Sequence, residues 1–119
     1  MELIIGGAYQ GKLEYAKNAL GITEADICDC AAEDIDFGKR CLYHYEQYLY
    51  KCAGRDEAPV LPTRIDAVVI ADDISCGVVP IDPTVRAWRE LCGRTLTAIA
   101  GKSETVTRLY CGIARSLKG

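Results

Sequence analysis

A glycine-rich stretch directly follows the first apolar run of the chain, and its spacing is typical of a phosphate-binding loop. The run covers residues 3–5, and the stretch reads Gly6-Gly7-Ala8-Tyr9-Gln10-Gly11-Lys12-Leu13. In a loop of the form Gly-x-x-x-x-Gly-Lys, backbone N–H groups and a helix N-terminus surround phosphate oxygens, and the lysine adds a mobile positive charge. We expect residues 6–13 to bind nucleotide phosphates. The alternative, a glycine turn that only precedes a helix, is weaker because strand, glycines, lysine and helix follow in the required order.

The last position of this loop departs from the pattern. A Ser or Thr hydroxyl normally binds Mg²⁺ there, whereas this chain has Leu13. A hydrocarbon side chain offers no oxygen to a hard cation. We therefore expect the anion cradle to be kept and Mg²⁺ binding to be weakened, with Asp73 and Asp29 as candidate metal ligands. A solvated aspartate at the start of an acidic turn is an equally good interpretation of Asp29.

Composition predicts one domain, residues 1–119, that does not bind nucleic acid or membranes. The chain has 119 residues, is 50% hydrophobic and carries a formal charge of −3, so it can bury a single core and lacks the basic surplus that nucleic acids or anionic membranes attract. No apolar stretch approaches the roughly 20 residues that cross a bilayer. Glu2 stands where a signal peptide would be basic. We expect a cytoplasmic protein.

The cysteines indicate neither a zinc site nor a disulfide framework. Their number is odd, and no two of them have the spacing Cys-x-x-Cys that zinc sites favour. Several fall on apolar stripes, so we expect small buried hydrophobic side chains that stay reduced. The seven cysteines stand at positions 28, 30, 41, 52, 76, 92 and 111.

Strand and helix signals alternate along the chain, which predicts an α/β fold with a mainly parallel sheet and flanking helices. Ligands of such folds gather at the carboxyl ends of the strands, so the loop of residues 6–13 and the pair Asp72-Asp73 should be neighbours. Gly21 is expected to end the first helix, and Asp82 to cap the last one. The predicted strands cover residues 2–5, 25–30, 66–71 and 105–111, and the predicted helices cover residues 13–20, 39–52 and 83–99.

Four segments together resemble one known family. They are residues 4–12, Asp73-Ile74-Ser75-Cys76-Gly77-Val78-Val79-Pro80, Arg86-Ala87-Trp88-Arg89-Glu90-Leu91-Cys92-Gly93-Arg94 and Cys111-Gly112-Ile113-Ala114-Arg115-Ser116-Leu117-Lys118. They resemble the bifunctional adenosylcobinamide kinase and adenosylcobinamide-phosphate guanylyltransferase family of cobalamin biosynthesis. The resemblance implies a truncated P-loop NTPase-like fold, ATP or GTP with Mg²⁺ as cofactors, a corrinoid alcohol as acceptor and a homo-oligomer, with a trimer as the first expectation.

The chain also departs from that family. Family members are longer, and the segment with their transiently guanylylated histidine has no counterpart here. His44 is the only histidine, and its neighbours lack the family's context, so we expect a half-exposed helix residue and no nucleophile. Gln10 and Leu13 replace two serines of the family's loop. Guanylyl transfer is therefore expected to be lost.

Two functions of different classes remain open. One is a shortened nucleotide-binding relative of the cobinamide enzymes, which, if active, transfers the γ-phosphoryl group of ATP or GTP as a kinase. The other is a non-catalytic regulatory or structural domain that keeps the fold for binding alone. Nucleotide turnover that depends on Mg²⁺ and a corrinoid acceptor would separate the two.

Overall fold

A computed structural model describes residues 1–74 and 82–119. The passage Gly77-Val78-Val79-Pro80, which contributed to the family resemblance, lies outside these described residues. In chain order the elements are β1 (Glu2–Gly6), α1 (Lys12–Leu20), the 3-10 turn η1 (Glu24–Asp26), β2 (Ile27–Asp29), β3 (Cys41–Tyr43), α2 (Tyr45–Gly54), β4 (Val68–Asp72), α3 (Pro83–Lys102), β5 (Thr105–Tyr110) and β6 (Ile113–Lys118).

The strands of the described residues form one six-stranded sheet in the order β2-β3-β4-β1-β5-β6. All neighbouring strands are parallel except the antiparallel pair β5 and β6. β1 therefore lies between β4 and β5, and the segments after these strands meet at one edge of the sheet. The prediction of an α/β fold with a mainly parallel sheet and flanking helices is confirmed.

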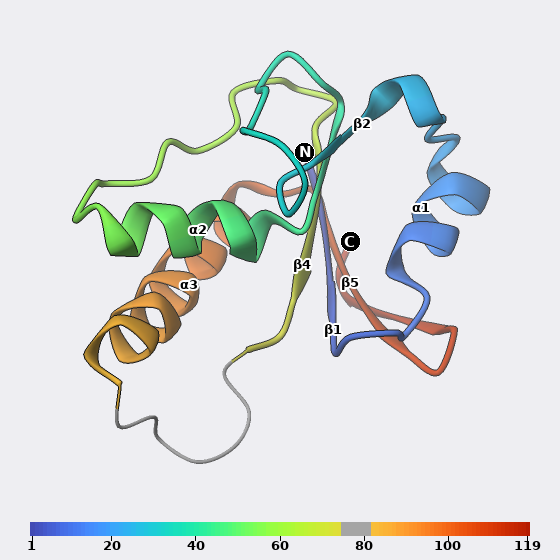
Figure 1. Cartoon of the computed structure of the whole chain (residues 1–119). Coiled ribbons are helices and arrows are strands. Elements are labelled where there is room, and N and C mark those ends of the chain that lie inside the picture. The colour runs from blue at the N-terminus through green and yellow to red at the C-terminus, as the bar shows by residue number, and fades with distance from the viewer. Residues whose placement is uncertain (75–81) are drawn as a thin grey trace.

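Helices cover both faces of the sheet, as Figure 1 shows. α1 lies on one face, and α2 and α3 pack together on the other. Because alternate strand residues point to opposite faces, Leu3 and Val69 join the core beneath α2 and α3, whereas Ile4 and Ile70 join the core beneath α1. The strands are thus apolar on both sides, which is typical of a buried parallel sheet.

The predicted helix over residues 39–52 is wrong at its beginning. Cys41 and Leu42 belong to β3, which pairs with β2 and β4, and α2 begins only at Tyr45. His44 separates the two elements because it has φ 56° and ψ 45°, a left-handed conformation that no α-helix continues. His44 is consequently the N-cap of α2 and not a residue within the helix.

The boundaries of the other elements follow the predictions with small shifts. Gly21 ends α1 with φ 68°, and the Asp82 side chain caps α3 by accepting hydrogen bonds from the backbone N–H groups of Thr84 and Val85. β6 was not predicted. Its six residues are all exposed, so the apolar-to-polar alternation that identifies a half-buried strand is absent from them.

The predicted burial of cysteine side chains is found for five residues. Burial raises the pKa of the Cys41 and Cys92 thiols to about 12, so these thiols stay protonated and unreactive. Cys111 is exposed, and Cys76 lies outside the described residues. The five buried cysteines, none in a disulfide, are Cys28, Cys30, Cys41, Cys52 and Cys92.

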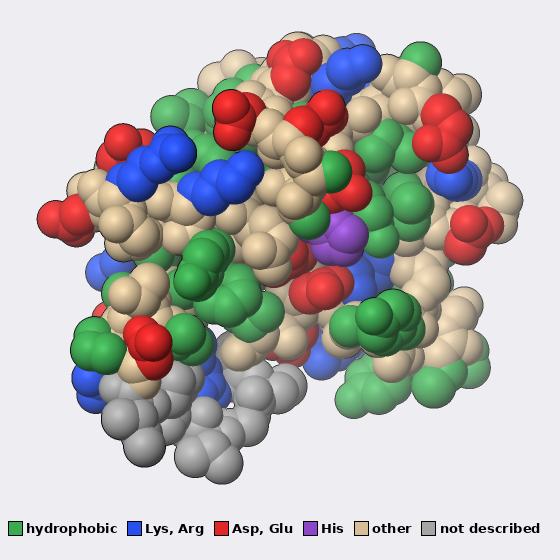
Figure 2. Space-filling view, in the orientation of Figure 1, with side chains coloured by type: hydrophobic (Ala, Val, Ile, Leu, Met, Phe, Trp, Pro, Cys, Tyr) green, Lys and Arg blue, Asp and Glu red, His purple; other side chains and the backbone are tan. Residues whose placement is uncertain are grey.

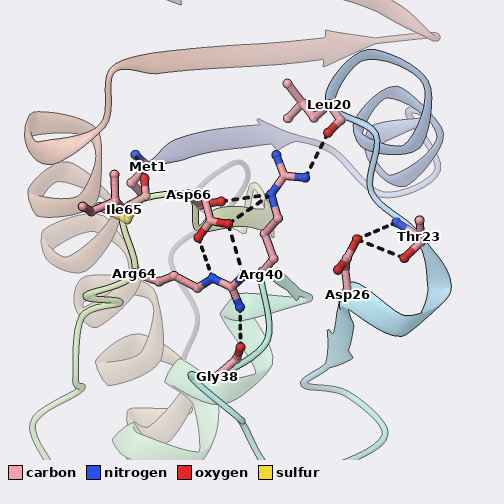
Figure 3. Close-up of polar contacts among 9 residues, drawn as sticks. All are labelled: Met1, Leu20, Thr23, Asp26, Gly38, Arg40, Arg64, Ile65 and Asp66. Atoms are coloured by element: carbon pink, nitrogen blue, oxygen red, sulfur yellow. Dashed lines mark hydrogen bonds and ion pairs between the residues drawn. The ribbon is translucent and has the colours of Figure 1, made fainter.

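Two arginines fasten the segments before β3 and β4 at the amino edge of the sheet (Figure 3). Arg40 donates to the backbone carbonyls of Leu20 and Asp66, and Arg64 forms an ion pair with the Asp66 carboxylate and donates to the carbonyl of Gly38. These contacts hold the amino edge together without any residue of the glycine-rich loop.

Gly6 allows β1 to approach β5 closely. A Cβ atom at this position would lie 2.7 Å from the carbonyl oxygen of Leu109, and φ of Gly6 is +157°. We expect Gly6→Ala to lower the free energy of unfolding by about 1–3 kcal/mol, because the backbone must shift to accommodate the methyl group. Urea denaturation measures this change.

Gly54→Ala is the matched control. A Cβ atom at Gly54 meets nothing within 4 Å, and alanine is favoured over glycine in a helix by about 0.5–1 kcal/mol. We expect this variant to be at least as stable as the parent. Equal stability of Gly6→Ala and Gly54→Ala would show that β1 and β5 do not need a glycine at their contact.

Candidate functional site

The loop between β1 and α1 presents a row of unused backbone donors. Gly11 is the N-cap of α1 with φ 88°, and no side chain caps the helix there. Tyr9 also has a positive φ, 61°. Among the described residues, the backbone N–H groups of residues 7–11 donate to no protein acceptor. Successive free N–H groups in such a turn, next to a helix N-terminus, form a concavity suited to an anion.

The loop is anchored to neighbouring strands on both sides. The backbone carbonyl of Gly6 accepts a hydrogen bond from Asp73 N–H at 2.8 Å, which ties the start of the loop to the end of β4. Gln10 is bonded to the β5–β6 turn, since its side-chain oxygen accepts from Cys111 N–H and its carbonyl accepts from Gly112 N–H. These contacts position the loop without using its N–H groups.

Lys12 is the positive charge of the site. Its side chain is only 4% exposed, and its Nζ lies 2.7 Å from Oδ1 of Asp72 and 2.6 Å from the carbonyl oxygen of Gly7. Asp72 is the last residue of β4 and pairs in register with Gly6 of β1. A buried ammonium group requires such a partner, because the cost of removing it from water is otherwise uncompensated. The expected proximity of the loop to the Asp72-Asp73 pair is therefore found, with Asp72 as the contacting residue.

Asp73 faces a different neighbour. Successive residues at the end of an extended strand point to opposite sides, and Asp73 forms an ion pair with Arg108 of β5 at 3.1 Å between Oδ2 and Nη2. Asp73 does not line the cavity beside the loop. Asp73, which the sequence suggested as a metal ligand, is thus not the aspartate that pairs with Lys12.

Asp29, the other metal candidate, lies at the end of β2 and orients the single histidine. Its Oδ1 lies 2.8 Å from Nδ1 of His44 and also accepts the N–H of Ala31 at 3.0 Å. The His44 ring stacks on Tyr43, with 3.8 Å between ring centroids. Within the described residues His44 Nε2 has no protein partner. The predicted position of Asp29 at a strand end is confirmed, and its side-chain partner is His44, the residue that follows β3.

The loop and the histidine line a single cavity of about 350 Å³. Figure 2 shows the histidine side chain near the middle of the face in view, with acidic and basic side chains beside it. A volume of this size is within the range of small-ligand pockets. The lining residues are Ala8, Tyr9, Gln10, Gly11, Lys12, Leu13, Glu14, Tyr43, His44 and Asp72.

Glu46 supports the end of β4 from inside the protein. Its side chain is buried, and Oε1 accepts the backbone N–H of Asp72 at 2.8 Å. The Glu46 backbone carbonyl accepts from the indole of Trp88 at 2.7 Å, which joins α2 to α3. Oε2 has no hydrogen-bond partner in the described ranges. Burial raises the pKa of the Glu46 carboxyl, because removal from water disfavours its charged form.

Sequence reasoning missed Glu46, Tyr43 and the specific role of Asp72. A signal for Glu46 was present, since it is a charged residue beside the apolar stripe that runs through Tyr45 and Leu49. Tyr45 and Leu49 belong to the core, and Glu46 beside them is buried as well. No sequence signal could place His44 opposite Asp29, because that contact requires β2 and β3 to pair.

Within residues 1–74 and 82–119, no group of three or more His, Cys, Asp and Glu side chains could hold a metal ion by itself. The same ranges contain no helix long and apolar enough to cross a membrane. Comparison with known proteins identifies no family, since neither a protein-family model nor a curated protein matches the chain.

The buried carboxyl of Glu46 should make stability depend on pH. Because the folded state raises the Glu46 pKa above its ordinary value of 4.5, the folded protein keeps a proton that the unfolded chain has released. The Glu46 carboxyl therefore contributes a decrease in the free energy of unfolding as pH rises above 4.5. We expect Glu46→Gln, which keeps the acceptor for Asp72 N–H, to remove this contribution in urea titrations above pH 4.5.

Glu90→Gln is the matched control, because it removes a carboxylate at an exposed position of α3. Its free energy of unfolding should vary with pH as that of the parent does. A parent-like slope in Glu46→Gln would contradict the assignment of the pH dependence to Glu46.

Proposed function

We propose that this chain binds the phosphates of ATP or GTP at the loop of residues 6–13, as a P-loop NTPase-like protein related to the adenosylcobinamide kinases. The supporting observation is the convergence of two kinds of donor on one cavity. The free N–H groups of residues 7–11 and the N-terminus of α1 supply oriented dipoles, and Lys12 supplies a charge. Both kinds of donor favour an anion with several oxygens, such as a triphosphate.

Phosphate binding involves an exchange of partners at Lys12. Without an anion, the ammonium group is satisfied by Asp72 and by the carbonyl of Gly7. A phosphate oxygen replaces these acceptors, so Lys12 turns toward the ligand and the Asp72 carboxylate becomes available. Mg²⁺ is commonly held by one or two carboxylates together with phosphate oxygens, and Asp72 would be the protein ligand in this arrangement.

The other metal candidates fit this arrangement less well. Asp29 is engaged by His44, and Asp73 by Arg108. Leu13 contributes no oxygen, so Asp72 is the aspartate of the three that can reach the cation beside Lys12. Mg²⁺ would neutralise phosphate charge, which is its usual contribution to phosphoryl transfer. The weakened Mg²⁺ site favours nucleotide binding with impaired transfer.

Leu13, which stands where the loop pattern has Ser or Thr, is also compatible with a second function, a regulatory or structural domain without catalysis. A non-catalytic binding domain needs the anion cradle but not a tight Mg²⁺ site. By the family resemblance, we propose a corrinoid alcohol as the acceptor of any phosphoryl transfer. We also propose that the chain assembles into a homo-oligomer, with a trimer as the first expectation. Exposed apolar side chains on the β5–β6 hairpin, Tyr110, Ile113 and Leu117, offer surface for such an assembly.

Lys12→Met tests phosphate binding. Methionine keeps most of the aliphatic stem and removes the charge, so we expect the dissociation constant for ATP or GTP to rise about tenfold to a hundredfold, as for the loss of a charged hydrogen bond. Titration calorimetry measures it. Lys51→Met is the control, because Lys51 lies on α2 and pairs with Asp34 at 3.6 Å. Equal affinities of Lys12→Met and the parent would refute the proposed site.

Leu13→Ser tests the metal site. The parent should bind nucleotide with little dependence on Mg²⁺, and the serine hydroxyl should add that dependence by restoring an oxygen ligand. Since Leu13 packs against the core beneath α1, the variant should also lose about 1–2 kcal/mol of stability, less than a fully buried leucine would. Nucleotide titrations with Mg²⁺ and with a chelator measure the difference.

Leu13→Ala separates the two effects, because it removes the same apolar contact and adds no oxygen. It should lose stability without gaining Mg²⁺ dependence. Strong Mg²⁺ dependence in the parent, with no increase in Leu13→Ser, would mean that Leu13 does not weaken the metal site.

A further inference from the structure

A second cavity lies on the opposite face of the sheet from α1, between α3 and the strands β1, β5 and β6. Its volume is about 470 Å³, larger than the cavity beside the glycine-rich loop. Most of its walls are hydrocarbon. They come from β1, α3, β5 and β6 and include Leu3, Ile5, Leu96, Ala100, Val106 and Leu117.

The cavity is separate from the phosphate-binding loop. Asp72 and Asp73 are adjacent at the end of β4, but Asp72 lines the loop cavity and Asp73 lines this one. No residue of the loop is among the lining residues of the second cavity. A ligand here is therefore additional to the nucleotide, and its binding does not rest on the proposed function.

The charged side chains of the lining lie toward its two ends. Asp73 and Arg108 form an ion pair near the carboxyl edge of the sheet. Lys118 pairs with Val106 toward the amino edge and donates to the backbone carbonyls of Ala100 and Gly101. Arg108 carries five N–H donors, one of which bonds to Asp73, and its guanidinium also contacts the Tyr110 ring at 5.5 Å. Donors therefore remain for a carboxylate, sulfonate or phosphate.

We propose that this cavity binds a small molecule that has an apolar body and one anionic group, with the anion beside Arg108 and the body between α3 and β1. The volume is within the range of about 300–1,000 Å³ that small-ligand pockets occupy. Largely apolar walls with a few polar groups are also the usual composition of such pockets. Arg108 fixes the orientation of the ligand, and the apolar walls supply most of the contact area.

Two fluorescent probes with the same ring system test this proposal on the whole chain. Anilinonaphthalene sulfonate has an apolar body and one anion, and N-phenylnaphthylamine has the same body without the anion. We expect the parent to bind the sulfonate saturably and at least about tenfold more tightly than the neutral probe, since a charged hydrogen bond contributes this much. Arg108→Gln should narrow the difference between the two affinities.

Two glycine substitutions on α3 locate the binding. Gly93 lines the cavity, whereas Gly101 does not, and a Cβ atom at either position meets nothing within 4 Å. Both positions are exposed, so both phenylalanine variants should fold. Gly93→Phe should weaken both probes at least about tenfold and leave nucleotide affinity unchanged, and Gly101→Phe should bind like the parent. Thr97→Phe, at another exposed lining position, replaces Gly93→Phe if that variant fails to fold.

Each outcome decides the proposal. Absence of saturable binding to the parent would overturn it. Equal affinity for the charged and the neutral probe would contradict the proposal that the ligand carries an anionic group. Parent-like binding by a folded Gly93→Phe variant would show that the probes bind at another apolar surface, and the proposed site would be wrong.

Discussion

The ion pair between Lys12 and Asp72 is the interaction on which the arrangement of the candidate site depends. Lys12 is almost completely buried, and removal of the partner of a buried charge typically costs about 3–5 kcal/mol. The pair forms because β1 and β4 are adjacent and Gly6 is in register with Asp72. The close approach of Gly6 to β5 and the support of Asp72 by Glu46 serve the same geometry. The glycine-rich loop is thus held by its strands and not by its own N–H groups.

The carboxyl edge of the sheet divides its charged groups between the two faces. Asp72 joins Lys12 on the side of the loop, and Asp73 joins Arg108 on the side of α3. Asp29, at the end of β2, and His44, which follows β3, add a third polar pair at the same edge. Ligands of parallel sheets gather at this edge because strand ends expose their backbone and side chains there. Two adjacent aspartates can consequently serve two separate cavities.

Local signals in the sequence predicted the elements that depend on local physics. The glycine-rich loop, the cap of α3 by Asp82 and the end of α1 at Gly21 all rest on neighbouring residues. β3 is three residues long, and its residues become a strand only through pairing with β2 and β4. β6 is exposed along its whole length, so hydrophobic patterning could not reveal it. The pairing of Asp29 with His44 follows from strand order, which no local pattern encodes.

The most direct test of the proposed site is a crystal structure with a nonhydrolysable GTP analogue and Mg²⁺. We expect the phosphates to lie against the N–H groups of residues 7–12 and Lys12 Nζ to have moved from Asp72 to a phosphate oxygen. Gln10 should keep its hydrogen bonds to the β5–β6 turn. A nucleotide bound elsewhere, with the Lys12–Asp72 pair intact and the loop without phosphate, would contradict it.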